Sequence, residues 1–404
     1  MKRTLFVLLL CVVLMGSLFT GCQKDAEDVV VDDKPVQDAE TAPEDTEVEV
    51  QPIKIGVAAP ITGNWAEYGL GFEVATAMAA EEINAAGGVN GRPIELVVMD
   101  SKGDAKEATA IARQFADDDE IMAVVGDFSS TCCMATAPIY EEAGLVQISP
   151  TASNPDYAGL NDYMFGVMGV QSAEGPFVGE YLLGKYVEAK NVAVIYLNND
   201  WGVSASSFLI EKAKEVGINI VAEENHVDGE KDFTALLTKV QQSNPDTICL
   251  VTFYNECAII ANQIAQMDWD VQITALGPGA SEQIIELGGE NVEGFLTSTP
   301  FFATDEGDSK ASTFKKAFEP KAGFTLNVHS ACAYDALYMV AEAMKNSDEI
   351  TRENVRDELA GLKGFVGVTG PIEFQPAGDI VRKYLIVGIE NGEWVQKTDY
   401  SYAD

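Results

Sequence analysis

The 404-residue sequence has few of the residues on which most catalytic and metal sites depend. Its two histidines, His226 and His329, lie about a hundred residues apart, so a catalytic triad or a histidine-rich metal site has little to be built from. It has seven cysteines, and the five that follow the N-terminal region show no spacing typical of a disulfide framework or a zinc site. The adjacent pair Cys132 and Cys133 fits small apolar packing within a helix. Glycine-rich phosphate loops, dinucleotide fingerprints, heptads and repeats are missing too. We therefore expect no enzyme, no metal and no cofactor.

Basic residues are also scarce. Lysine and arginine total 26 against 64 acidic residues, which gives a formal net charge of −38. Such a charge argues against binding nucleic acid, and against direct binding to an anionic membrane surface. A small anionic ligand is still compatible with it, because the start of a helix is locally positive.

The N-terminus has the pattern of a secretory signal. Lys2 and Arg3 precede an apolar run over residues 5–14, and small residues lead to Cys22. Residues 18–22 (LFTGC) resemble a bacterial lipoprotein signal, although Phe19 stands where an aliphatic residue is usual. We expect residues 1–21 to be the signal peptide and Cys22 to be lipidated, which would anchor the protein at the extracytoplasmic face of the cell membrane. Ordinary cleavage that leaves a free Cys22 is the alternative.

An acidic segment follows. Residues 23–51 hold eleven acidic residues, two lysines and no aromatic residue, so they bury too little apolar surface to fold. We predict that residues 22–52 form the lipidated cysteine and a disordered tether.

Strand and helix patterns then alternate along the chain. Apolar runs at 52–58, 94–99 and 123–125, and again at 192–196, 218–222, 247–251 and 272–276, are separated by helical periodicities. This alternation predicts parallel sheets built from βαβ units, in two Rossmann-like lobes because one sheet would be too large. Near the C-terminus, residues 314–318, 337–344 and 353–362 indicate helices. Residues 370–374 and 383–389 indicate a hairpin.

Hydroxyl residues follow two of these strands. Ser129, Ser130 and Thr131 come after the strand that ends at Gly126, where a helix begins, and a second hydroxyl-rich stretch occupies residues 149–153. The edge of an open α/β sheet is where such proteins bind small ligands, and a helix start offers unpaired N–H groups to a carboxylate. The alternative is that Ser130 only caps its helix.

The order of these segments resembles the type I periplasmic-binding-protein family, in its leucine/isoleucine/valine-binding branch. The residues that carry the resemblance are 63–69 (GNWAEYG), 82–91 (EINAAGGVNG), 100–104 (DSKGD), 125–126 with 129–130, 138–144 (PIYEEAG), and 370–371 with 378–379. The resemblance implies an α/β fold of two lobes joined by three crossings, with the ligand in the cleft between them. Placed on this chain, lobe one is 53–170 with 301–365, and lobe two is 171–300 with 366–404.

The resemblance also implies a set of ligand-binding residues. Ser130, Thr151, Ala152 and Ser153 match the positions that hold the ligand's carboxylate. Tyr68 matches a side-chain contact from lobe one. The positions that match aromatic walls contributed by lobe two are Trp201 and Tyr254.

One departure concerns the ligand's ammonium. The family commonly places an acidic residue where this chain has Gly279. Glu282 is the substitute that we expect, with Glu256 as a second candidate. The other possibility is that the ligand lacks an ammonium and is an amide or a keto acid.

The resemblance implies a substrate-binding receptor of an ABC importer. We expect a monomer that closes around an aliphatic or branched-chain amino acid and delivers it to the permease subunits. A sensor of the same fold that signals to a partner is the alternative function.

Overall fold

The computed structural model describes residues 50–404, so the predicted signal peptide and all but the last residues of the predicted tether lie outside the described residues. A five-stranded parallel sheet has the strand order β2-β1-β3-β4-β5. Its strands are β1 (Ile53–Ala59), β2 (Ile94–Asp100), β3 (Ile121–Gly126), β4 (Val146–Ser149) and β5 (Met164–Gly166).

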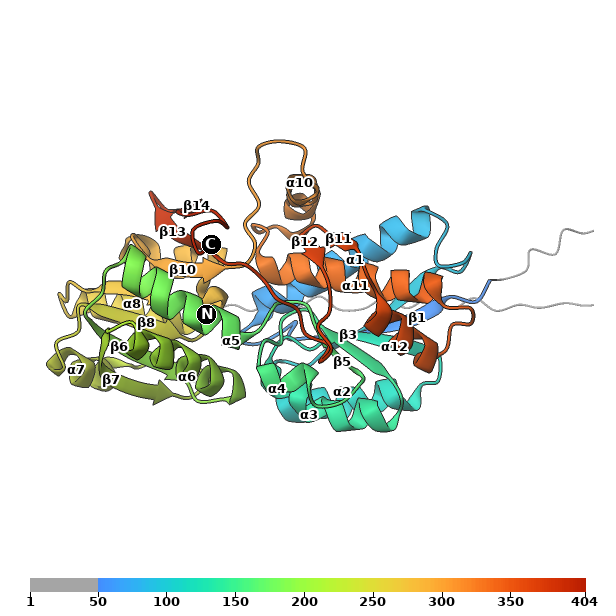
Figure 1. Ribbon diagram of the computed structural model, residues 1–404, viewed down its shortest axis with the longest axis horizontal. Coiled ribbons are helices and arrows are strands. Elements are labelled where there is room, and N and C mark those ends of the chain that lie inside the picture. The colour runs from blue at the N-terminus through green and yellow to red at the C-terminus, as the bar shows by residue number, and fades with distance from the viewer. Residues whose placement is uncertain (1–49) are drawn as a thin grey trace, which may run out of the picture. The chain divides into compact units, whose positions relative to one another are not determined.

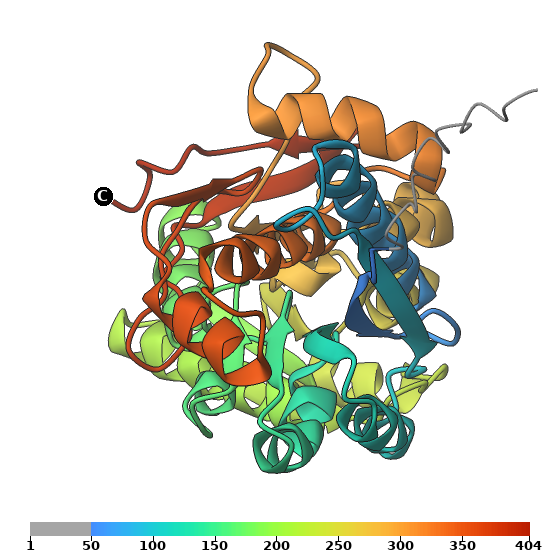
Figure 2. The same ribbon diagram turned by 90° about the vertical axis from the view of Figure 1, so that its right-hand side faces the viewer.

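Helices cover both faces of this sheet. In Figure 1, α2 and α3 lie below it, and α1 and α11 lie above it. The helices packed around it are α1 (Ala66–Ala85), α2 (Ala105–Asp117), α3 (Ser130–Glu142), α4 (Pro155–Ala158), α10 (Lys310–Ala322), α11 (Val328–Asn346) and α12 (Arg352–Gly361). Figure 2 shows α10 and α11, both orange, beside the blue α1, although more than 200 residues separate them in the sequence.

The second sheet has seven strands in the order β14-β13-β10-β9-β8-β6-β7. Its strands are β6 (Asn191–Leu197), β7 (Asn219–His226), β8 (Thr247–Val251), β9 (Gln272–Ala275), β10 (Leu296–Thr299), β13 (Leu385–Glu390) and β14 (Glu393–Gln396). Strands β6 to β10 are parallel, whereas β13 runs antiparallel to both β10 and β14.

The helical segments of this second half surround the sheet. They are α5 (Gln171–Phe177), which continues into η1 (Val178–Tyr186), α6 (Asp200–Glu215), α7 (Thr234–Gln242), α8 (Tyr254–Gln266), η2 (Gly277–Gly279), α9 (Glu282–Gly288) and η3 (Gly289–Val292). The predicted α/β fold with two mainly parallel sheets is therefore confirmed. None of the helices in residues 50–404 combines the length and the apolar character needed to cross a bilayer.

The C-terminal hairpin was predicted with the wrong partners. Strand β12 (Gly370–Ile372) pairs with β11 (Phe365–Gly367), and residues 383–389 instead supply β13, which pairs with β10 and β14. The sequence pattern marked both strands, but the choice of partner depends on long-range packing that a local pattern does not contain.

Contacts of the same region with the five-stranded sheet concern the position of the third crossing between the lobes. The N–H of Gly166 in β5 donates to the Gly378 carbonyl at 2.9 Å, and Phe374 packs on Phe165 with ring centroids 5.0 Å apart. Phe374 and Gly378 thus contact β5 of the five-stranded sheet, whereas the expected boundary after residue 365 assigns them to lobe two. We propose that the third crossing lies at residues 381–384, directly before β13.

Candidate functional site

The hydroxyl residues after β3 and β4 lie together, because these strands are neighbours and run parallel. Ser129 caps α3: its Oγ accepts a hydrogen bond from the N–H of Cys132 at 3.1 Å. The Ser149 hydroxyl donates to the Asp127 carbonyl at 2.8 Å and so ties the second loop to the first. The Thr151 hydroxyl adds a bond to the Phe128 carbonyl at 2.5 Å.

Not every donor in these loops is free. The Thr151 hydroxyl already donates to the Phe128 carbonyl, and the N–H of Ala152 donates to Ser149 Oγ at 2.8 Å. Ser130 Oγ accepts from the N–H of Asn154 at 3.2 Å, which leaves its own proton available. Within residues 50–404, Ser153 Oγ takes part in no hydrogen bond. Ser130 and Ser153 therefore each have a hydroxyl proton available for a ligand, as does Ser129, whose Oγ only accepts from Cys132.

These loops form one wall of a cavity that residues of the second sheet complete. Of the predicted residues, Ser130, Thr151, Ser153 and Trp201 line it. Trp201 stands in the first turn of α6, where it stacks on Phe253 with centroids 5.2 Å apart and an interplanar angle of 24°. The remaining wall residues are Phe128, Ser129, Met168, Glu174, Phe253, Gly277, Pro278, Pro300, Val328, His329 and Tyr384.

The other predicted residues lie outside the cavity wall. Tyr68 is fully buried behind it, stacked on Phe128 at 4.4 Å, and its hydroxyl donates to the Pro278 carbonyl at 2.5 Å. The hydroxyl of Tyr254 donates to the Asn64 carbonyl at 3.1 Å. Glu282 is half-buried at the start of α9 and does not line the cavity. Cys22 lies outside the described residues.

Several wall residues carried no signal in the sequence. Phe128 and Phe253 each lie two residues after the end of a strand, a place where an aromatic residue is as often part of the core. His329 lies in the first turn of α11, and burial lowers the pKa of its imidazole to about 3, so it is neutral at pH 7. Its Nδ1 is buried without a partner.

The cavity is small. Its volume is about 30 Å³, room for a water molecule or two and not for an amino acid. Polar contacts between its two sides surround it, including those from Tyr68 to Pro278 and from Ser281 to Glu67. Entry of a ligand thus requires the walls to move apart, as they do when a two-lobed protein opens at its crossings.

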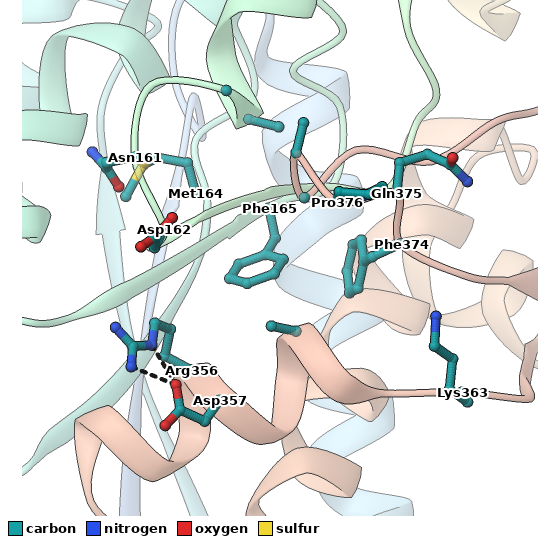
Figure 3. A pocket seen from close by; sticks show the side chains of 15 residues that line it. Asn161, Asp162, Met164, Phe165, Arg356, Asp357, Lys363, Phe374, Gln375 and Pro376 are labelled. Carbon is teal, nitrogen blue, oxygen red and sulfur yellow. Dashed lines mark hydrogen bonds and ion pairs between the residues drawn. The ribbon is translucent and has the colours of Figure 1, made fainter.

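A wider hollow of about 590 Å³ lies elsewhere on the first half and shares no residue with the cavity (Figure 3). Three of its four charged residues are already paired, Asp162 being the exception: Arg356 Nε donates to Asp357 Oδ1 at 2.7 Å, and Lys363 pairs with Glu373 at 2.7 Å. We therefore take the small cavity, with its available hydroxyl groups, as the candidate site.

Comparison with known proteins agrees with this architecture. A family model described as periplasmic binding protein matches residues 52–393. The leucine-, isoleucine-, valine-, threonine-, and alanine-binding protein of Pseudomonas aeruginosa is 28% identical over 329 residues, which cover 81% of this chain and 87% of that protein. An amino acid binding protein of the same organism is 31% identical over 359 residues, with 86% and 91% covered.

Among solved structures, the branched-chain amino acid transporter substrate binding protein LivJ from Streptococcus pneumoniae, in complex with isoleucine, superposes with a TM-score of 0.80. It is 29% identical, and the match covers 86% of this chain and 100% of that one. The chain belongs to the type I periplasmic-binding-protein family, in its leucine/isoleucine/valine-binding branch. Members of this family are extracytoplasmic substrate-binding proteins of ABC transporters rather than enzymes.

Proposed function

We propose that this protein binds an aliphatic, most readily a branched-chain, amino acid and delivers it to the permease of an ABC importer. The observation that carries the proposal is the meeting of Ser130 and Ser153, each with an available hydroxyl group, in a cavity between the two sheets. Neutral hydroxyl groups beside the start of a helix bind a carboxylate without a buried counter-charge. Phe128, Trp201 and Phe253 supply apolar walls for a short aliphatic side chain.

We expect Ser130→Ala and Ser153→Ala each to weaken amino acid binding. The loss of one hydroxyl donor to a carboxylate costs about 1.5–3 kcal/mol, or roughly ten- to a hundred-fold in affinity. Isothermal titration calorimetry with leucine, isoleucine, valine and alanine measures this loss of affinity. Ser312→Ala is the matched control, because the Ser312 hydroxyl is buried on α10 and donates to the Gly307 carbonyl, outside the cavity. Unchanged affinity in both variants would show that these serines do not bind the ligand and serve only as helix caps.

We propose that Cys22 is lipidated and holds the protein at the extracytoplasmic face of the membrane, with residues 23–51 as the tether. The lipoprotein-like signal supports this, as does the surplus of acidic residues that precedes the folded part. Cys22→Ser is expected to shift the protein from the membrane fraction to the medium, or to leave the signal uncleaved. Immunoblotting of fractionated cells distinguishes these results, and normal processing with continued membrane attachment would contradict lipidation.

A sensor of the same fold is the second candidate function. No observation in residues 50–404 favours it over transport, and dependence of cellular amino acid uptake on this protein would separate the two.

A further inference from the structure

Glu174 is a buried carboxylate without a cation. Its side chain, on α5, is 5% exposed, and its Oε1 accepts hydrogen bonds from the N–H of Gly277 at 2.9 Å and from Ser298 Oγ at 2.8 Å. No lysine, arginine or histidine of residues 50–404 lies within ion-pair distance of it. Arg382 lies beside Tyr384, but its Nη1 and Nη2 donate to the Val167 and Thr369 carbonyls and to the Thr369 hydroxyl, and its Nε has no partner among the described residues.

This carboxylate borders the candidate ligand cavity. Glu174 is part of the cavity wall, which also contains Ser130 and Ser153 from the other sheet. Both of its hydrogen bonds go to Oε1, while Oε2 accepts none from the described residues. One oxygen thus fixes the side chain in place, and the other is left for a donor that the protein itself does not supply.

The loop at residues 277–279 explains how the carboxylate gets there. A Cβ atom on Gly277 would lie 2.8 Å from Glu174 Oε1, so a larger residue at this position would push the carboxylate from its present place. A Cβ atom on Gly279 would instead meet the Ala275 side chain at 3.1 Å and the Phe295 ring at 3.4 Å. Gly279 is not part of the cavity wall, whereas Gly277 and Pro278 are.

We propose that Glu174 binds the α-ammonium group of the ligand, in place of the acidic residue that is absent at Gly279. The inference rests on the proposed function, because it takes the cavity as the ligand site. Burial raises the pKa of Glu174, and the bonds from Gly277 and Ser298 act in the opposite direction. A buried carboxylate without a cation is costly, and an ammonium in the cavity removes that cost. The site then selects molecules that carry both charges over keto acids.

The other candidate acids do not reach the cavity. Glu256 is 1% exposed with its Oε2 unpartnered, but it is absent from the wall and lies near Asp228 and Gly229. Glu67 accepts hydrogen bonds from Ser281 and Asn327. These placements leave Glu174 as the acid on the cavity wall.

The test uses three probes of one carbon skeleton: L-leucine, its 2-keto acid 4-methyl-2-oxopentanoate, and L-leucinamide, which keeps the ammonium but lacks the carboxylate. They are titrated by calorimetry into the mature protein and into Glu174→Gln. Glutamine is isosteric, and its Oε1 can still accept from Gly277 and Ser298, so the fold is retained. Glu180→Gln is the matched control, because Glu180 pairs with Lys185 outside the cavity and its loss changes the net charge equally.

We expect Glu174→Gln to lose at least about thirty-fold in affinity for leucine, the size expected when one partner of a buried charge pair is removed. Its affinity for the keto acid should be unchanged or higher, which also shows that the variant is folded, and Glu180→Gln should match the parent with every probe. Leucine affinity in Glu174→Gln within about threefold of the parent would overturn the inference.

The inference and the proposed function can fail separately. If the parent protein binds the keto acid but neither leucine nor leucinamide, the role of Glu174 is overturned while binding of a carboxylate stands. If it binds none of the three probes, both are overturned for this ligand class. Loss of leucine binding in Glu256→Gln but not in Glu174→Gln would move the ammonium site to Glu256 and likewise overturn the inference.

Discussion

Phe128→Ala is expected to lower the free energy of unfolding by about 3–5 kcal/mol, the usual cost of removing a fully buried phenylalanine ring. Phe128 is 3% exposed, and its ring lies in an aromatic cluster drawn from both halves of the protein. It stacks on Tyr68 at 4.4 Å and packs against Phe253 at 5.5 Å and Trp65 at 5.9 Å. A void at this position removes contacts on several sides at once, and these aromatic neighbours are too large to collapse into it.

The same substitution should also weaken ligand binding, because Phe128 lines the cavity. Urea unfolding followed by circular dichroism measures the stability, and calorimetry measures the affinity. Tyr186→Ala is the control: this ring is 37% exposed, so its loss should change stability by less than about 1 kcal/mol. A change as small in Phe128→Ala would mean that the ring is not part of a packed core.

Glu67→Gln is expected to become progressively more stable, relative to the parent, as the pH rises from about 4.5 to about 7. Burial raises the pKa of Glu67 from 4.5 to about 7, against the opposing effect of its bonds to Ser281 and Asn327. In this window the folded protein holds a proton that the unfolded chain has released, so the parent loses stability as the pH rises. A shift of this size corresponds to roughly 3 kcal/mol, and glutamine does not titrate.

The free energy of unfolding must be compared as a difference between the variant and the parent at each pH, because other buried groups titrate in the same range. Burial raises the pKa of Asp127 to about 6 and that of Glu256 to about 7, while that of His329 falls to about 3 and so acts in the opposite direction. These contributions cancel in the difference. Unfolding in urea at pH 5 and pH 8 measures it.

Glu81→Gln serves as the control for Glu67→Gln, since Glu81 is an exposed acid on the same helix that pairs with Lys321. The stability difference should change with pH more for Glu67→Gln than for Glu81→Gln. A difference between Glu67→Gln and the parent that does not change with pH would show that folding does not raise the pKa of Glu67.

Much of the fold could be predicted from local patterns. The alternation of apolar strands with helical periodicity is a property of each segment, and the C-terminal helices were marked by their own periodicity in the same way. The resemblance then supplied the arrangement into two lobes. The pairing of residues 383–389 was missed because a strand and its partner can lie far apart: β13 pairs with β10, about ninety residues earlier.

The candidate site was only partly predictable. Ser130 and Ser153 could be found because each follows a strand end, and neighbouring parallel strands bring their ends together. Glu174 could not, since nothing near it in the sequence sets it apart from an exposed helical glutamate. Its place in the site depends on Gly277, more than a hundred residues later, having no side chain in its way.

The packing of α11 against α1 has a consequence for the way the chain is made. The first five strands and their helices are synthesised early, yet the helix that covers α1 spans Val328–Asn346. The second sheet likewise is incomplete until β13, at Leu385–Glu390, has been synthesised. Neither half can complete its core on the ribosome until almost the whole chain exists. The order of synthesis therefore delays completion of both cores, which suits a member of an extracytoplasmic family.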